Sequence, residues 1–296
     1  MQKPIVHIAA FVAMLFWGMS YIWSKVVFEY YTPLTSIFLR LIISFTVLFL
    51  FIHISGQREA IRKKDIRIFI ISALFNPFLY FVGEYYGLHR VSASVSAIII
   101  ATIPVFTPVV AFYVFREKLS VVNIAGLTIS FSGILFLIFK KDFTLNASPV
   151  GVALLFLAVF AAIIYSVYLK RLSGRYKPAT IIAWQNLIGT AYFLPFFLVL
   201  DAKNFVAVRP DPMAIASLVM LGVFASSMCY MLYTYSVKHL GISRTNIYTN
   251  LIPVFAGVTS YLALDEAFNL YKIGGMLIVL FGVILSQMNL KKLKSS

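Results

Sequence analysis

The chain has 296 residues, of which 61% are hydrophobic and only 12% are charged. Soluble domains carry about 25% charged residues, so this composition excludes an ordinary soluble fold. The formal net charge of +15 could indicate nucleic-acid binding, but the basic residues lie between apolar runs and in the C-terminal tail. That placement is typical of membrane orientation and predicts no nucleic-acid partner.

The apolar runs are about 20 residues long, which is the length that crosses roughly 30 Å of hydrocarbon as a helix. Inside lipid the backbone must satisfy its own hydrogen bonds, and a helix does so. We therefore expect an all-α integral membrane protein with ten transmembrane helices. In chain order they cover residues 5–27, 33–54, 67–88, 91–115, 121–139, 150–169, 178–200, 213–237, 242–264 and 270–288.

The basic residues between these helices predict the orientation of the chain. They concentrate in residues 58–67, 116–118, 170–177 and 238–244 and in the C-terminal tail, whereas the opposite side receives few. Because Lys and Arg are enriched in cytoplasmic loops, both termini are predicted to be cytoplasmic. We expect a multi-pass protein of a bacterial inner membrane, with the lipid bilayer as its surroundings.

The two halves of the sequence resemble each other. At an offset of 149 residues, Pro104 aligns with Pro253, Glu117 with Glu266, and Gly133 with Gly282. At an offset of 145, Pro33 aligns with Pro178, Thr35 with Thr180, and Arg40 with Gln185. These matches predict two five-helix repeats, residues 1–145 and 146–296.

A repeat with an odd number of helices places its two copies upside down relative to each other. Inverted repeats suit alternating access, because two similar halves can exchange conformations around one central site. A duplication that is kept only for packing is the other interpretation. We favour transport of a small metabolite.

Two segments that each hold a mid-helix proline, a following acidic residue and a glycine-spaced helix carry a family resemblance. They read "SASVSAIIIATIPVFTPVVAFYVFREKLSVVNIAGLTISFSGILFL" and "GISRTNIYTNLIPVFAGVTSYLALDEAFNLYKIGGMLIVLFGVIL", and "FWGMSYIWSK" near the N-terminus adds to them. The chain resembles the drug/metabolite transporter superfamily, and within it the EamA-type ten-helix exporters. The resemblance implies a basket-like bundle around a central cavity and the export of amino acids or related metabolites. The sixth helix lacks a counterpart of the pair Trp17–Gly18, so the halves are not equivalent.

Charges deep in a bilayer cost at least about 2.5–3.5 kcal/mol, which makes them candidates for function. Arg40 and Glu84 are such residues. Arg40 could bind a substrate carboxylate through its guanidinium fork. Glu84 could hold an ammonium group or take up a coupling proton. The alternative is a structural ion pair between Glu84 and either Arg40 or Lys25, although Lys25 fits an interfacial anchor better.

Neutral polar and aromatic residues form a second group of cavity candidates. Asn246 and Asn250 share one helix face and could bind substrate, or could bridge packed helices. An aromatic cage could hold apolar or cationic groups, although such residues are often core packing. The aromatic candidates are Trp17, Tyr21, Tyr80, Trp184, Tyr230 and Tyr248.

Prolines and glycines at matching repeat positions suggest moving or closely packed helices. Pro104 and Pro253 could act as hinges, or could fix a permanent bend. Gly126–Gly133 and Gly275–Gly282 allow close backbone approach, which would join either the two halves or two monomers of a homodimer. Glu117 and Glu266 are interpreted as helix N-terminal caps.

Other functional classes fit the sequence less well. The four histidines lie far apart and Cys229 is the sole cysteine, so we expect no metal, no cofactor and no catalytic residue. No Walker motif occurs, so a gradient or exchange must supply the energy. A channel would need a selectivity loop or an oligomeric pore. Drug or cation efflux and nucleotide-sugar or sugar-phosphate transport remain as alternatives, and a membrane-embedded enzyme is a remote one.

Overall fold

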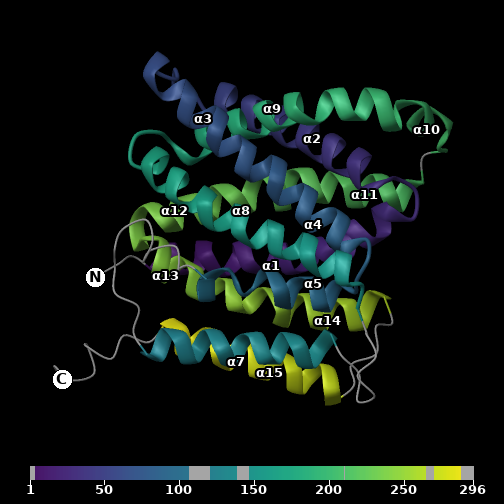
Figure 1. Cartoon of the computed structure of the whole chain (residues 1–296). Helices are drawn as coiled ribbons and strands as arrows, with labels where there is room; N and C mark the ends of the chain where they lie inside the picture. Colours follow the sequence, from purple (N-terminus) through teal and green to yellow (C-terminus); the bar gives the residue numbers. More distant parts are fainter. Residues whose placement is uncertain (1–3, 107–120, 139–146, 210, 265–269, 288–296) are drawn as a thin grey trace.

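A computed structural model gives the fold and describes residues 4–106, 121–138, 147–209, 211–264 and 270–287. Within these ranges the chain is helical and contains no strand. The helices lie side by side and run back and forth across the bundle (Figure 1). This arrangement confirms the predicted all-α class.

The helices of the first half follow the predicted apolar runs. They are α1 (Pro4–Phe28), α2 (Pro33–Ile54), η1 (Lys63–Asp65), α3 (Ile66–Ala73), η2 (Leu74–Leu79), α4 (Tyr80–Leu88), α5 (Ala93–Ile100) and α7 (Val121–Ile138). Residues 103–106 are also helical. The predicted caps Glu117 and Glu266 lie outside the described residues.

The second half contains the same kind of elements. They are α8 (Pro149–Ser173), α9 (Pro178–Phe196), η3 (Phe197–Asp201), α10 (Ala202–Ala207), α11 (Pro212–Met220), η4 (Leu221–Met228), α12 (Cys229–Leu240), α13 (Ile242–Ile247), η5 (Tyr248–Leu251), α14 (Ile252–Leu264) and α15 (Leu270–Gln287).

Local sequence explains where several helices begin. Thr32, Ser148 and Asp211 each cap a helix with the side chain, and each is followed by a proline at the first helical turn. A capping oxygen satisfies a free backbone N–H, and proline lacks the N–H that would otherwise stay unbonded there.

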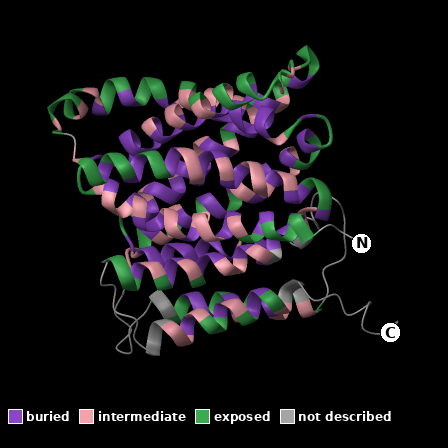
Figure 2. Ribbon diagram, turned by 180° about the vertical axis from the view of Figure 1, so that it is seen from behind, coloured by how far each residue is buried: buried purple, intermediate pink, exposed green. Residues whose placement is uncertain are grey.

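The distribution of side chains is that of a membrane protein. Six helices of the described chain are long and apolar enough to cross a bilayer: Pro4–Phe28, Pro33–Ile54, Lys63–Leu88, Pro149–Ser173, Pro178–Ala207 and Pro212–Leu240. Shorter apolar helices cover Ala93–Phe106, Ile124–Phe136 and Ile273–Leu285. Many large apolar side chains are exposed, whereas many Ser, Thr and Asn side chains are buried. Buried residues concentrate where the helices face one another (Figure 2).

Helices from the two halves pack against each other in pairs. Helix α2 packs on α9, α4 packs on α8, and α1 packs on both α12 and α14. Helices α7 and α15 form a pair at one side of the bundle (Figure 1). A Cβ added at Gly282 would lie 2.4 Å from the backbone nitrogen of Ser130, and one at Gly133 would lie 2.8 Å from Cγ2 of Val279. These two glycines therefore join the two halves.

The helices that surround the bundle interior are interrupted. At Asn76 the backbone leaves helical geometry, with φ −145° and ψ 117°, immediately before Pro77. Pro104 and Pro253 were expected in mid-helix, but each is the second residue of a helix that starts after a break. Proline is tolerated there because the first turn needs no N–H donor. Their role as hinges stays a prediction.

Candidate functional site

A buried cavity of about 70 Å³ lies between helices of both halves. Its walls come from α1, α2, α4, α5, α8, α12 and α14 and from the interrupted segments beside them. The lining residues are Trp17, Ser20, Tyr21, Arg40, Asn76, Tyr80, Phe81, Glu84, Ile100, Ile103, Ala162, Tyr165, Ser166, Tyr230, Tyr233, Asn246, Thr249 and Ile252. The space can hold a few water molecules or a small solute.

Most lining residues form pairs that the sequence offsets of 145 and 149 align. Both members of each pair line this cavity: Trp17 and Ala162, Ser20 and Tyr165, Tyr21 and Ser166, Phe81 and Tyr230, Glu84 and Tyr233, Ile100 and Thr249, and Ile103 and Ile252. The aligned side chains differ in chemistry. Because one half contributes Arg40 and Glu84 and the other contributes neutral groups, the cavity is polarised.

Arg40 on α2 is held by neutral groups. It is 3% exposed. Its Nε donates to Oγ of Ser226 at 2.7 Å, and its Nη1 donates to the hydroxyl of Tyr85. The guanidinium carbon lies 4.4 Å from the ring centroid of Phe81 and 5.1 Å from that of Tyr85. Cation–π contacts of this kind gain strength where water is excluded.

Glu84 on α4 is also held by neutral groups. Its Oε1 accepts a hydrogen bond from the Tyr80 hydroxyl at 2.8 Å and a longer one from the Tyr21 hydroxyl at 3.4 Å. The described chain contains no ion pair between Glu84 and Arg40, and Lys25 donates to the carbonyl oxygen of Val91 at 2.7 Å. The ion pair considered from the sequence is therefore not formed in this structure.

Trp17 and two tyrosines form an aromatic wall of the cavity. The centroid of the Trp17 ring lies 5.0 Å from that of Tyr230 and 5.3 Å from that of Tyr233. The indole Nε1 donates to the carbonyl oxygen of Ala225 at 3.0 Å, which fixes the ring. The Tyr233 hydroxyl donates to Oδ1 of Asn246 at 2.7 Å.

Trp184 and Asn250, both candidates from the sequence, do not line the cavity. Trp184 packs on Phe49, with ring centroids 5.7 Å apart, and lines a separate recess beside Thr180. Asn250 also lies outside the lining, and its buried Oδ1 has no hydrogen-bond partner in the part of the chain that the structure describes. The segment η5 interrupts the helix that carries Asn246 and Asn250, so a spacing of four residues does not place both on one face. Trp184 lies on α9, which contributes none of the described lining residues.

Several residues in or beside the cavity were missed from the sequence. Tyr85 and Ser226 position Arg40, and Asn76 donates to the hydroxyl of Tyr230 at 3.2 Å. The repeat offers a signal for two others, since Tyr165 aligns with Ser20 and Tyr233 aligns with Glu84.

A neutral hydrogen-bond network lies beside the cavity. Gln185, which aligns with Arg40, accepts from the Tyr165 hydroxyl at 3.0 Å and donates to Oγ of Ser72 at 2.9 Å. Asn186 donates to Oγ of Ser44 at 2.7 Å. Such interhelical bonds contribute on the order of 0.6 kcal/mol each in membranes, so they fix positions more than they stabilise the fold.

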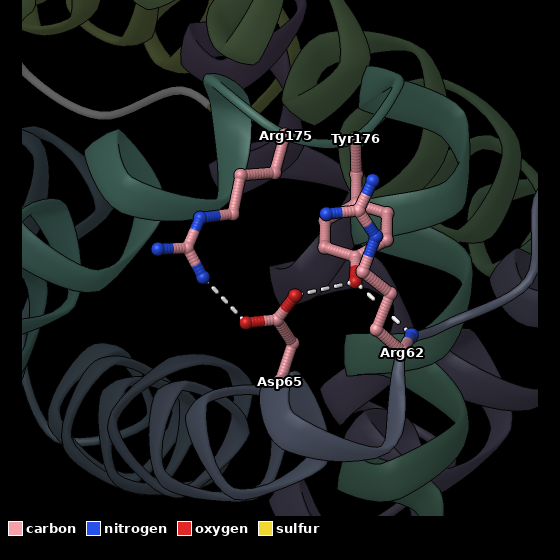
Figure 3. A network of polar contacts seen from close by, with 4 residues as sticks. All are labelled: Arg62, Asp65, Arg175 and Tyr176. Atoms are coloured by element: carbon pink, nitrogen blue, oxygen red, sulfur yellow. Dashed lines mark hydrogen bonds and ion pairs between the residues drawn. The ribbon is translucent and has the colours of Figure 1, made fainter.

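A charged cluster joins two connections at one end of the bundle. Asp65 accepts from Nη1 of Arg175 at 2.5 Å and from the Tyr176 hydroxyl at 2.7 Å, and that hydroxyl accepts from the backbone N–H of Arg62 (Figure 3). The Tyr176 hydroxyl, together with the Arg175 guanidinium, holds the pKa of Asp65 below its usual range, against the opposing effect of burial. The described residues contain no group of His, Cys, Asp and Glu that could hold a metal ion.

A helical membrane bundle whose halves share a buried polar cavity is the architecture of a small-molecule transporter. The profile of the EamA-like transporter family matches residues 4–139 and 149–288, and the chain belongs to this family. It is a multi-pass membrane protein of the drug/metabolite transporter type.

Relatives and a solved structure agree with this assignment. The chain is 25% identical to the uncharacterized transporter YcxC of Bacillus subtilis, over 98% of this chain and 95% of that one. It is 26% identical to an uncharacterized transporter of Archaeoglobus fulgidus, over 90% and 93%. One crystal structure has a TM-score of 0.72 at 15% identity, over 97% and 99% of the two chains, and this likeness concerns the fold alone.

Proposed function

We propose that the protein is a secondary active transporter that exports amino acids or related small metabolites from the cytoplasm by alternating access. The observation that carries this proposal is the presence of Arg40 and Glu84 in one buried cavity, each held by neutral side chains and not by the other. We place the chain in a bacterial inner membrane, with both termini cytoplasmic.

The remaining atoms of the two charged groups suit a zwitterion. Nη2 of Arg40 and Oε2 of Glu84 have no hydrogen-bond partner among the described residues. Neither atom is fully buried. An amino acid carries a carboxylate for the guanidinium and an ammonium group for the carboxylate. Each of these two ligand groups would gain a charge-assisted hydrogen bond in the cavity, so a ligand with both signs is favoured.

Alternating access is supported by the relation between the halves. Aligned positions line one cavity, and α2–α9 and α7–α15 pair each helix with its counterpart in the other half. We propose residues 1–145 and 146–296 as two inverted repeats that exchange conformations. Pro104 and Pro253, beside matching breaks, are the proposed hinges. The cavity of about 70 Å³ is smaller than ligand pockets of about 300–1,000 Å³, so larger substrates require the bundle to open.

Glu84 is the proposed coupling group. It is the acidic residue of the cavity lining, and it accepts hydrogen bonds only from tyrosine hydroxyls within the described chain. A carboxylate in this position can bind a proton or an ammonium group. Competition between the two would couple substrate movement to a proton gradient.

The aromatic wall favours one second candidate, the efflux of organic cations. Trp17, Tyr230 and Tyr233 surround the cavity that contains Glu84, and aromatic faces attract cations. The positive charge of Arg40 in the same cavity opposes this alternative. A sugar phosphate is less suited, because Arg40 is the only cation among the described lining residues and Glu84 would repel the phosphate.

Counterflow in liposomes tests the proposed function. Purified protein would be reconstituted with one class of unlabelled compound inside, and uptake of the labelled compound would be measured for amino acids, organic cations and sugar phosphates. The proposal predicts counterflow of at least one neutral amino acid above protein-free liposomes. Counterflow of cations or sugar phosphates without any amino acid would contradict it.

A further inference from the structure

Helices α2 and α9 pack together, and each starts beside the region where the other ends. Their first turns align at the offset of 145, so that Thr32 corresponds to Lys177 and Thr35 to Thr180. An acidic residue that follows one helix contacts the first turn of the other. Asp201 follows α9 and contacts the start of α2, and Glu59 follows α2 and contacts the start of α9.

We call the contact between α2 and α9 the seam. At its Asp201 end the acidic residue is hydrogen-bonded to the first turn of α2, so this end is closed. Oδ2 of Asp201 accepts from Oγ1 of Thr32, from Oγ1 of Thr35 at 2.9 Å and from the backbone N–H of Thr35 at 3.2 Å. Asp201 is 7% exposed and Thr35 is 2% exposed. A carboxylate is favoured at a helix N-terminus because it satisfies free N–H groups and interacts with the helix dipole.

The Glu59 end also has an acidic residue beside a helix start and a threonine in the first turn, but only one hydrogen bond joins Glu59 to that helix. Oε2 of Glu59 accepts from the backbone N–H of Lys177 at 2.9 Å. Oγ1 of Thr180 has no hydrogen-bond partner among the described residues, although Thr180 is 1% exposed. Glu59 and Thr180 line one recess of about 320 Å³, together with Phe49, Ile52, His53, Arg58 and Trp184.

We propose that Asp201–Thr35 and Glu59–Thr180 are alternating latches at the two ends of this seam. The first is closed and the second is open in this structure. When the recess closes, the Glu59 carboxylate accepts the hydrogen bond of Thr180, and Asp201 releases Thr35 at the opposite end. A buried hydroxyl without a partner is costly, so each state leaves one cost that the other state removes. Two states of similar free energy are what alternation needs. The inference rests on the proposed alternating access.

Labelling of single cysteines at the two ends tests the latches. The reporters are Ile52→Cys in the recess and Leu34→Cys near Asp201, which are 8% and 4% exposed as the native residues. Both are introduced with Cys229→Ala, since Cys229 is the native cysteine. The rate of maleimide labelling is measured on the full chain in lipid nanodiscs, with and without an amino-acid mixture.

Two isosteric substitutions bias the latches in opposite directions. Thr180→Val removes the hydroxyl that would close the recess, so we expect labelling of the Ile52→Cys reporter to rise and that of Leu34→Cys to fall, each by about fivefold, as for loss of one hydrogen bond. Thr35→Val should do the reverse. Thr234→Val is the matched control, because Oγ1 of Thr234 is also buried without a partner within the described ranges but lies in α12. It should change neither rate.

The outcomes separate the latches from the mechanism on which they rest. Reporters that respond reciprocally to the amino-acid mixture, but not to Thr180→Val or Thr35→Val, overturn the latches and leave alternating access intact. Shifts in the same direction in both variants also overturn the latches. Reporters that never respond reciprocally overturn alternating access and the latches with it.

Discussion

Arg40 and Glu84 line the same buried cavity and yet make no ion pair with each other. Arg40 is bonded to Ser226 and Tyr85, and Glu84 is bonded to Tyr80 and Tyr21. Neutral partners hold both charges in place without neutralising them. The cavity therefore offers one group of each sign to a ligand, which is the basis of the proposed zwitterion site.

Tyr85→Phe should weaken substrate binding without removing a charge. The variant leaves Arg40 bonded to Ser226 but removes the hydroxyl that accepts from Nη1. A hydrogen bond to a charged group contributes about 1.5–3 kcal/mol, and part of that loss should appear as a raised half-saturation concentration in counterflow. Tyr86→Phe is the control, since the Tyr86 hydroxyl makes no hydrogen bond in the described structure. Equal effects of the two substitutions would contradict the positioning role of Tyr85.

The two tryptophans expected in the cavity should behave differently. Trp17 forms the cavity wall and is fixed by its bond to Ala225, whereas Trp184 lies in the separate recess. We expect Trp17→Phe to raise the half-saturation concentration for counterflow about tenfold, the effect of losing about 1.4 kcal/mol of binding free energy. Trp184→Phe should leave this concentration unchanged. A larger binding defect in Trp184→Phe would show that the substrate site has been misplaced.

Thermal stability should depend on pH through Asp65. Tyr176 and Arg175 lower the pKa of Asp65 in the folded protein. Ionised Asp65 therefore stabilises the fold at pH values above its ordinary pKa of 3.8, and this stabilisation is lost as the pH falls through the lower folded-state pKa. Asp65→Asn should therefore lower the melting temperature by an amount that is constant from about pH 5 to 8 and shrinks only below about pH 4. The measurement is melting in detergent over that range. A difference that disappears near neutral pH would contradict the assignment.

The α7–α15 pair should tolerate no side chain at its closest contact. Gly282→Ala places a Cβ against the backbone of Ser130, so we expect a loss of about 1–3 kcal/mol in stability. Gly274→Ala on the same helix is the control, because its Cβ would meet only Cε1 of Phe136 at 4.0 Å. Chemical unfolding in mixed micelles measures both variants. Equal stability of the two would show that the helices are not packed as closely as the structure has them.

Much of the fold followed from hydrophobicity alone. The helix at residues 33–54 was predicted with its observed bounds, because Thr32–Pro33 marks its start and the apolar run ends at Ile54. The breaks at Asn76, after Ile100 and before Pro253 were not predicted, since backbone polar groups can leave helical bonding only where other parts of the protein receive them. That condition depends on tertiary contacts which the local sequence does not encode.

The site could be predicted only in part, for a related reason. Arg40 and Glu84 were recognisable because charges inside an apolar run are rare. Tyr85 and Ser226 were not, because tyrosine and serine are common in membrane helices and only packing brings them to Arg40. Asn246 lines the cavity and Asn250 does not, because equal spacing on a helix face assumes an unbroken helix, and η5 interrupts this one.

The central claim is that Arg40 binds the carboxylate of a zwitterion. The most direct test compares counterflow of an amino acid with that of its methyl ester, which keeps the ammonium group and lacks the carboxylate charge, in the wild type and in Arg40→Lys. Lysine keeps the positive charge but not the bidentate fork. We predict that the wild type prefers the amino acid strongly and that Arg40→Lys loses most of this preference while it still transports the ester. Equal preference in both proteins, with both correctly folded, would contradict the zwitterion site.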